Sequence, residues 1–206
     1  MFVISITGGI ASGKSALTEY LRPEAAAIVD ADAIAHEVMA PGGPAYQPVV
    51  ERFGPGILTG GRVINRHALA DIVFNDPGAL RDLNGITHPI IAATINERLT
   101  ELRRTLPLAA IVILRAPLLL EAGLADAGDL NVVVTAPEDV RLNRIVNFRG
   151  GTPEEARRRM AAQMRDEERA KYADMIIENT ADRSALADAA EKIVASARRS
   201  GPERAI

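Results

Sequence analysis

Short apolar runs alternate with longer segments of helical periodicity along most of the chain. The apolar runs are rich in β-branched residues and occupy residues 2–7, 27–30, 109–114, 131–135 and 174–178. Runs that are apolar almost throughout are typical of strands buried on both faces of a parallel sheet, with helices in the connections. The pattern therefore predicts an α/β fold with a five-stranded parallel sheet flanked by helices.

The predicted strands are unevenly spaced. Between residues 30 and 109 the periodicity is helical, with helices predicted at 33–39, 46–53, 66–74, 77–87 and 89–106. Because this is more chain than one crossover helix needs, we predict a helical insertion over residues 33–106. A second excursion at residues 144–171 is dense in charge and suits a mobile lid. Residues 1–32, 107–143 and 172–206 then form the core domain.

Composition indicates a soluble protein without nucleic-acid or membrane partners. The 206 residues are 48% hydrophobic and 25% charged, with a net charge of −3 and no cysteine. A negative chain offers no global positive field to polyanions, and the lack of cysteine excludes disulfides and thiolate chemistry. The apolar stretch 106–122 is interrupted by prolines and charges, and the apolar N-terminus lacks a basic stretch. We therefore expect a cytoplasmic enzyme.

A glycine-rich turn follows the first predicted strand and leads into a helix predicted over 15–21. It matches the pattern G-x-x-x-x-G-K-[ST] with Gly8, Gly9, Ile10, Ala11, Ser12, Gly13, Lys14 and Ser15, and Ala16 follows. Glycines let backbone N–H groups approach phosphate oxygens, and the helix N-terminus adds partial positive charge. We expect Lys14 to reach the β- and γ-phosphates and the Ser15 hydroxyl to bind Mg²⁺. Residues 8–16 are thus predicted to bind a nucleoside triphosphate.

The loop alone does not identify the reaction, because GTPases, motor ATPases and small-molecule kinases share it. The guanine signature Asn-Lys-x-Asp is absent from the chain. A D-x-x-G spacing at residues 82–85 lies in a helical region with no strand before it, so we regard it as a chance match. A small-molecule kinase is the favoured class.

Two carboxylates, Asp30 and Asp32, end the second predicted strand. Side chains two apart in an extended segment share a face, so both can point toward the phosphate loop at the carboxyl edge of the sheet. A kinase acting on a hydroxyl needs a carboxylate to orient it and accept its proton. Asp32 is our candidate base, with Asp30 assisting or binding Mg²⁺ through water. Alternatively, Asp32 is an N-cap for the helix predicted near residue 33.

Several motifs together resemble the dephospho-CoA kinase family over nearly the whole chain. Besides the loop they are Asp-Ala-Asp at 30–32, Phe-Asn-Asp-Pro at 74–77, Ile-Thr-His-Pro at 86–89, Pro-Leu-Leu-Leu-Glu at 117–121, Ala-Gln-Met at 162–164, and Asn179. The resemblance implies phosphorylation of the ribose 3′-hydroxyl of dephospho-CoA by ATP with Mg²⁺. The products would be coenzyme A and ADP, in the last step of coenzyme A biosynthesis.

The resemblance also implies roles for residues outside the loop. The insertion would bind dephospho-CoA, the lid would close on ATP, and Asp32 matches the catalytic base. His88, which by itself suggests a helix start, becomes an acceptor-site residue. Pro117 and Leu118 would line the acceptor cleft, and Glu121 would bind there or merely start the next helix.

The lid supplies candidate cations for the transferring phosphoryl group. Arginine forks match phosphate geometry, but most of these arginines resemble a solvated helix face. We expect at most two or three to touch ATP and prefer Arg144, as a catalytic residue, and Arg149, from the set Arg144, Arg149, Arg157, Arg158, Arg159 and Arg165.

The sequence departs from the family pattern at three positions. Arg115 stands where many relatives have aspartate, Phe148 where they usually have arginine, and Arg169 where a lysine often follows the lid glutamates. These departures leave open the Mg²⁺ ligands and the lid cations. They also leave two alternatives: a kinase for another nucleoside or nucleotide, and a non-catalytic nucleotide-binding module. The chain is expected to be a monomer or a weak homo-oligomer.

Overall fold

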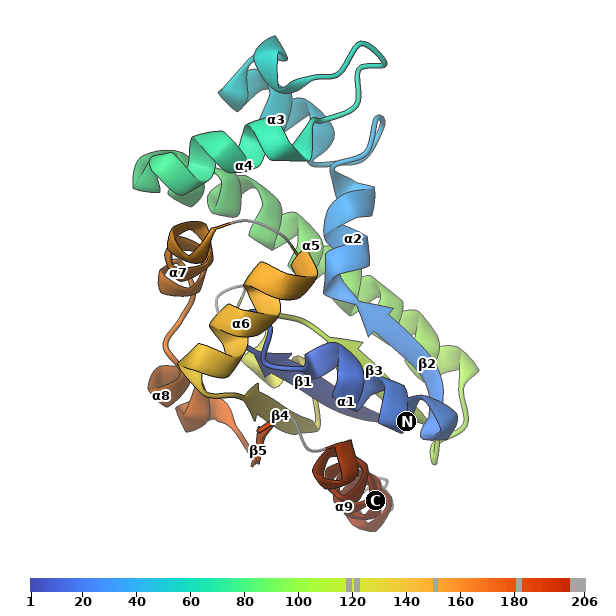
Figure 1. Cartoon of the computed structure of the whole chain (residues 1–206). Coiled ribbons are helices and arrows are strands. Elements are labelled where there is room, and N and C mark those ends of the chain that lie inside the picture. The colour runs from blue at the N-terminus through green and yellow to red at the C-terminus, as the bar shows by residue number, and fades with distance from the viewer. Residues whose placement is uncertain (118–119, 121–122, 150–151, 181–182, 201–206) are drawn as a thin grey trace. The chain divides into compact units, whose positions relative to one another are not determined.

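The structure is a computed structural model that describes residues 1–117, 120, 123–149, 152–180 and 183–200. Its central feature is one parallel sheet of five strands. The sheet order is β2-β3-β1-β4-β5 (Figure 1). The strands are β1 (Phe2–Gly8), β2 (Ala25–Asp30), β3 (Ile111–Arg115), β4 (Leu130–Thr135) and β5 (Met175–Glu178). The predicted five-stranded parallel sheet is confirmed, and every predicted strand lies where the apolar pattern indicated.

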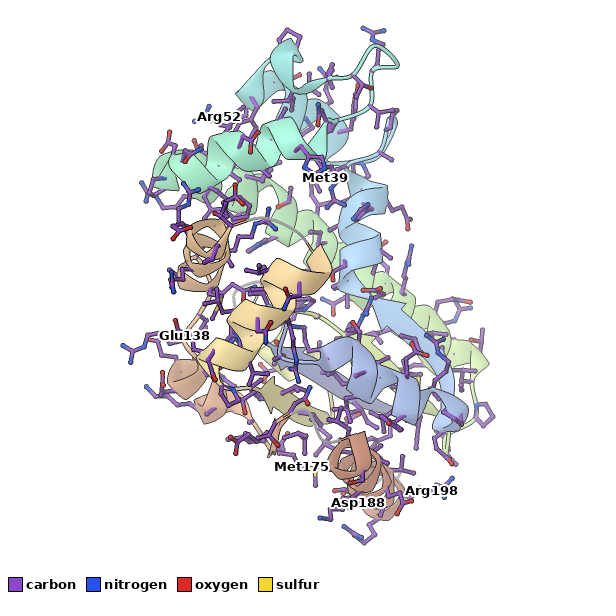
Figure 2. All side chains as sticks on the ribbon, in the orientation of Figure 1. Met39, Arg52, Glu138, Met175, Asp188 and Arg198 are labelled. Carbon is purple, nitrogen blue, oxygen red and sulfur yellow. The ribbon has the colours of Figure 1, made fainter. Side chains whose placement is uncertain are left out.

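Helices α1 (Lys14–Leu21) and α9 (Arg183–Ser200) pack side by side over one face of the sheet (Figure 1). Leu17 of α1 and Ile193 of α9 are buried against alternate strand residues, among them Ile4 of β1. The opposite side of α9 is polar, with Asp188 and Arg198 exposed (Figure 2). This amphipathic pairing holds α1, and with it the loop that precedes α1, against the sheet.

Helix α6 (Glu138–Arg149) follows β4, and α7 (Pro153–Ala161) packs against it. The short helix α8 (Asp166–Arg169) then leads through a 3₁₀ turn to β5. Thr152 caps α7 reciprocally: its hydroxyl accepts from the Glu155 N–H at 3.2 Å, and the Glu155 carboxylate accepts from the Thr152 N–H at 2.8 Å. Residue 144 lies inside α6, so the predicted lid boundary does not coincide with the start of an element. The assignment of residues 144–171 as a lid stays a prediction.

Residues Ala31–Glu97 form a second compact unit, separate from the unit of Met1–Asp30 and Arg98–Ile206. It contains α2 (Ala31–Val38), α3 (Tyr46–Phe53), α4 (Arg66–Asn75) and much of α5 (Pro77–Thr105). Its own core consists of buried apolar residues that include Val49, Leu69 and Val73. Among the described residues of this unit, β pairing outside helices is a single bridge between Leu58 and Ile64. The predicted role in acceptor binding stays a prediction.

Helix α5 corrects the prediction of two helices at 77–87 and 89–106. The structure has one helix from Pro77 to Thr105, with Pro89 inside it. Proline removes one backbone donor and crowds the carbonyl four residues earlier. That earlier residue is Gly85, and the single lost hydrogen bond does not interrupt the helix. Farther along, Ile95 and Leu99 are buried and anchor the helix by packing. None of the helices in the described ranges is both long and apolar enough to cross a membrane.

Candidate nucleotide site

The glycine-rich loop connects β1 to α1 in a conformation that only its glycines permit. Gly13, at the start of α1, has φ 105°, in the region that favours glycine. A Cβ at Gly13 would overlap the Asn179 side-chain amide, and one at Gly8 would overlap the Val134 carbonyl. The loop therefore lies tightly against the ends of β4 and β5, at the carboxyl edge where ligands bind in open α/β sheets.

Lys14 folds back over the beginning of the loop. Its ammonium group donates to the carbonyl of Gly8 at 2.7 Å and to that of Gly9 at 2.8 Å, and the residue is buried. These bonds hold a positive charge next to the loop backbone. This location agrees with the predicted contact of Lys14 with phosphates, which stays a prediction.

Two arginines from one face of α6 bind the carbonyl groups of the loop. Arg141 donates from Nε to the Ile10 carbonyl at 2.9 Å, and Arg144 donates to the Ala11 carbonyl at 3.1 Å. In a trans peptide the carbonyl and the N–H of the next residue point in opposite directions. The bond from Arg141 therefore turns the Ala11 N–H away from α6, whereas the Ser12 N–H donates within the loop to the Gly9 carbonyl at 3.2 Å.

Asn179, directly after β5, braces the same loop. Its side-chain Nδ2 donates to the Ser12 carbonyl at 2.8 Å, and its Oδ1 accepts from Arg144 at 3.3 Å. Its own backbone N–H donates to the Thr135 carbonyl at 2.8 Å, which anchors it to β4. Arg144, predicted as a catalytic residue, thus contacts the loop and Asn179, and its catalytic role stays a prediction.

The segment predicted as a lid also reaches the loop. The Gln163 side-chain oxygen accepts from the Ile10 N–H at 2.7 Å. Asp166 joins two buried arginines: its carboxylate lies 3.0 Å from Arg141 and 2.7 Å from Arg169, which is 0% exposed. A carboxylate shared by two buried guanidinium groups compensates one of their two positive charges, which helps to hold Arg141 against the loop at low solvent exposure.

Sequence reasoning missed several of these loop partners. Arg141 stands three residues before the predicted site residue Arg144, and on α6 this spacing places both on one face. That spacing was the available signal for Arg141. Gln163 and Asn179 lie in motifs of the family but had no assigned role, and nothing in the sequence indicated the part played by Asp166.

A further contact involves the hydroxyl predicted to bind Mg²⁺. Arg115, the last residue of β3, donates from Nη1 to the Ser15 hydroxyl oxygen at 2.9 Å. Its other terminal nitrogen forms an ion pair with Asp30, the last residue of β2. The structure thus joins the predicted metal ligand and one of the two predicted carboxylates through a guanidinium group.

The loop also contains a buried polar atom that suits an anionic ligand. The Ser12 hydroxyl oxygen is buried and has no hydrogen-bond partner within the described ranges of the chain. An unsatisfied buried hydroxyl is costly, and a ligand oxygen would relieve that cost. Together with the tight glycine backbone, this atom makes the loop a suitable cradle for phosphates.

Asp32 begins a separate cluster in the second unit. Helix α2 starts at Ala31, so Asp32 lies in the first helical turn. The alternative of an N-cap is therefore wrong, and so is the extended backbone assumed beyond Asp30, since only Asp30 lies in β2. His36 follows one turn later, and its Nδ1 lies 2.6 Å from Nη1 of Arg66. Burial lowers the pKa of the Arg66 guanidinium, and the negative charge of Asp32 works in the opposite direction.

The remaining predicted acceptor residues are divided among different places. His88 is half-buried inside α5, so its interpretation as a helix start is wrong. The Pro117 carbonyl accepts from the Thr7 hydroxyl at 3.3 Å. Leu118 and Glu121 lie outside the described residues, as do the side chains of Phe148 and Arg149. Their predicted roles are untested.

Comparison with known proteins identifies the family. Residues 2–184 match the family model for dephospho-CoA kinase. A dephospho-CoA kinase from Moorella thermoacetica is 44% identical over 182 residues, which are 88% of this chain and 85% of the relative. The solved structure of dephospho-CoA kinase from Campylobacter jejuni is 28% identical and covers 96% of this chain and 97% of that chain, with a TM-score of 0.69. A shikimate kinase from Acinetobacter baumannii, 14% identical over 94% of this chain and 91% of that chain with a TM-score of 0.51, shares the fold alone. The chain belongs to the dephospho-CoA kinase family.

Proposed function

We propose that this chain phosphorylates the ribose 3′-hydroxyl of dephospho-CoA with ATP, giving coenzyme A and ADP. This is the last step of coenzyme A biosynthesis. The observation that carries the proposal is the phosphate loop, whose carbonyls are bound by Arg141 and Arg144 while its lysine lies against its first residues. Family membership supports the acceptor, which the loop alone does not specify.

ATP fits this loop because the loop presents groups that complement phosphate. Residues Gly8, Gly9, Ile10, Ala11, Ser12, Gly13, Lys14, Ser15 and Ala16 would hold the triphosphate, through backbone N–H groups and the Lys14 ammonium. The buried Ser12 hydroxyl supports an anionic occupant. Arg144 would neutralise charge that develops on the transferring phosphoryl group, and Arg149 is the second candidate for that role.

Mg²⁺ is the proposed metal, and Ser15 is its proposed ligand on the chain. Mg²⁺ commonly takes one or two protein groups and completes its shell with substrate phosphates and water. One exposed hydroxyl oxygen with two lone pairs is therefore sufficient, even though Arg115 donates to it. When bound, the metal supplies charge neutralisation to the β- and γ-phosphate oxygens.

Asp32 is the proposed base that orients the acceptor hydroxyl and accepts its proton. The nearby charge of Arg66 and the contact of Arg66 with His36 support a polar site around it. Asp30, His88, Pro117, Leu118 and Glu121 complete the proposed acceptor-binding set. Dephospho-CoA is then the proposed acceptor bound by these residues, and ATP the proposed ligand of the loop.

We also propose that the protein works in the cytoplasm, as a monomer or a weak homo-oligomer, without nucleic-acid or membrane partners. The net charge of −3 supports the absence of polyanion binding. Sedimentation velocity over a range of concentrations would test the oligomeric state.

The decisive experiment is a coupled assay of purified protein with ATP, Mg²⁺ and dephospho-CoA. Formation of ADP and of coenzyme A should be equal and should depend on the acceptor. Lys14→Met provides the inactive reference. Turnover that is faster with a nucleoside monophosphate would indicate a different kinase. ATP binding without ADP release that depends on the acceptor would indicate a binding module instead.

A further inference from the structure

Arg115 occupies the place beside Ser15 where P-loop enzymes usually have an acidic group. In P-loop nucleotide-hydrolysing enzymes, Mg²⁺ is held by the loop Ser or Thr and by an aspartate from a neighbouring strand. Here the neighbouring strand β3 ends in arginine, and this residue is in register with both Ile6 of β1 and Asp30 of β2. The strand register therefore directs a cation, instead of a carboxylate, to the predicted metal ligand.

The two terminal nitrogens of Arg115 are used separately. Nη1 donates to the Ser15 hydroxyl at 2.9 Å, whereas Nη2 pairs with the Asp30 carboxylate. The side chains of Arg115 and Asp30 are 24% and 25% exposed, so solvent screens their charges only in part. The pair adds almost no net charge next to Ser15, whereas a lone Asp30 would add one negative charge that attracts a divalent cation.

We infer that Arg115 is a fixed cation of the nucleotide site. Its guanidinium group binds the triphosphate directly, so that ATP binding requires Mg²⁺ less. The inference rests on the proposed binding of ATP at the loop. A guanidinium group has five N–H donors in a planar fork that matches phosphate, and the two contacts above use only two of them. Because Arg115 neutralises Asp30, Ser15 also lacks a nearby net negative charge that would attract a divalent cation. Arg115 thus determines how much ATP binding depends on Mg²⁺.

Isothermal titration calorimetry with ATP tests this directly, once in excess Mg²⁺ and once in EDTA. The quantity to compare is the ratio of the Kd without metal to the Kd with metal. In the unmodified chain this ratio should be below about tenfold. Loss of a charge-assisted hydrogen bond to phosphate in Arg115→Gln should raise the ratio by roughly tenfold or more, through weaker binding in EDTA.

Asp30→Asn gives an independent result in the opposite direction. It removes the charge that compensates Arg115 and keeps the side-chain shape, so binding in EDTA should strengthen and the ratio should fall. Arg115→Lys keeps the positive charge and should keep a ratio close to that of the unmodified chain. Arg104→Gln is the matched control, because it removes an exposed arginine paired with Glu101 and should leave the ratio unchanged.

If Arg115→Gln leaves the ratio of Kd values unchanged while the unmodified chain binds ATP, this inference is overturned and the proposed function is not. A rise of the ratio in Asp30→Asn would also overturn it, even if Arg115→Gln failed to fold as judged by circular dichroism. No ATP binding to the unmodified chain in either buffer would overturn the proposed function as well.

Discussion

Asp32 stands in the first turn of α2, and its negative charge interacts with the guanidinium group of Arg66. If Asp32 accepts the proton of the acceptor hydroxyl, Asp32→Asn removes the base and keeps the size of the side chain. We expect kcat to fall by about a hundredfold or more, with the Kd for ATP close to wild type. Steady-state kinetics and calorimetry measure the two quantities.

The matched control for Asp32→Asn is Asp71→Asn, which changes an exposed aspartate of the same unit. Its kcat should equal that of wild type. Unchanged turnover in Asp32→Asn would show that Asp32 is not the base.

Arg66 contacts His36 of α2 and interacts electrostatically with Asp32 of the same helix. Arg66→Gln removes the contact with His36 and the positive charge that acts together with Asp32. We expect kcat/KM for dephospho-CoA to fall by roughly tenfold, the size of one lost polar contact in a site, while the Kd for ATP stays unchanged. Acceptor-dependent initial rates measure this effect.

Arg52→Gln is the reference for Arg66→Gln, since it also removes an arginine of the second unit, one that pairs at the surface with Asp82. An equal loss in both variants would mean that Arg66 acts only through the stability of the unit.

The identity of Asp32 as a candidate base was available from the motif. Arg66 was not, because its contact with His36 joins residues that lie 30 positions apart in the chain.

At the scale of elements, α6 is the support of the phosphate loop. Arg141→Gln removes the bond to the Ile10 carbonyl and one of the two cations around Asp166. We expect ATP affinity to fall by about ten- to a hundredfold, because the loop loses a charged hydrogen bond and Asp166 loses a buried partner. We also expect faster hydrogen exchange of the α7 and α8 amides, measured by mass spectrometry.

Arg157→Gln serves as the control for this element, because Arg157 is an exposed arginine of α7. It should change neither ATP affinity nor amide exchange around the loop. An Arg141→Gln protein with normal ATP affinity would show that the loop keeps its conformation without α6.

Element positions followed from the sequence because apolar periodicity is a local property. Helix α3 has the predicted bounds, and each strand lies at its predicted run. The predicted break at Pro89 was wrong. The prediction took this proline as the boundary between two helices, but α5 continues past it and packs through the buried Ile95 and Leu99. The bonds of Arg141, Arg144 and Asn179 to the loop carbonyls could not be predicted, since these residues lie far along the chain and meet the loop only through the sheet order.

At the scale of the whole molecule, the two units have separate cores, and ligand binding should stabilise them differently. At a concentration of a hundred times its Kd, ATP should stabilise the native chain by about 2.7 kcal/mol. Leu69→Ala opens the core of the second unit, where Leu69 is 5% exposed, and should cost about 2–5 kcal/mol. Because the loop belongs to the other unit, the ATP increment should be the same in this variant.

Urea unfolding with and without ATP measures both effects, and Lys14→Met should lose most of the ATP increment. A smaller ATP increment in Leu69→Ala would instead reveal coupling between the core of the second unit and the loop.

The family could be predicted from the sequence because its motifs are distributed over nearly the whole chain. The division at Ala31 and Glu97 depends on contacts that no single motif encodes.

The discontinuous first unit has a consequence for synthesis on the ribosome. Residues Ala31–Glu97 emerge as one uninterrupted stretch and can close their core early, as units commonly do during translation. The central strand β1 is made first, yet both of its neighbours, β3 and β4, come after that stretch. Asn179, which braces the phosphate loop, is translated later still. The nascent chain therefore carries its loop sequence before the residues that brace it and gains the ability to retain nucleotide only after Asn179 has been made.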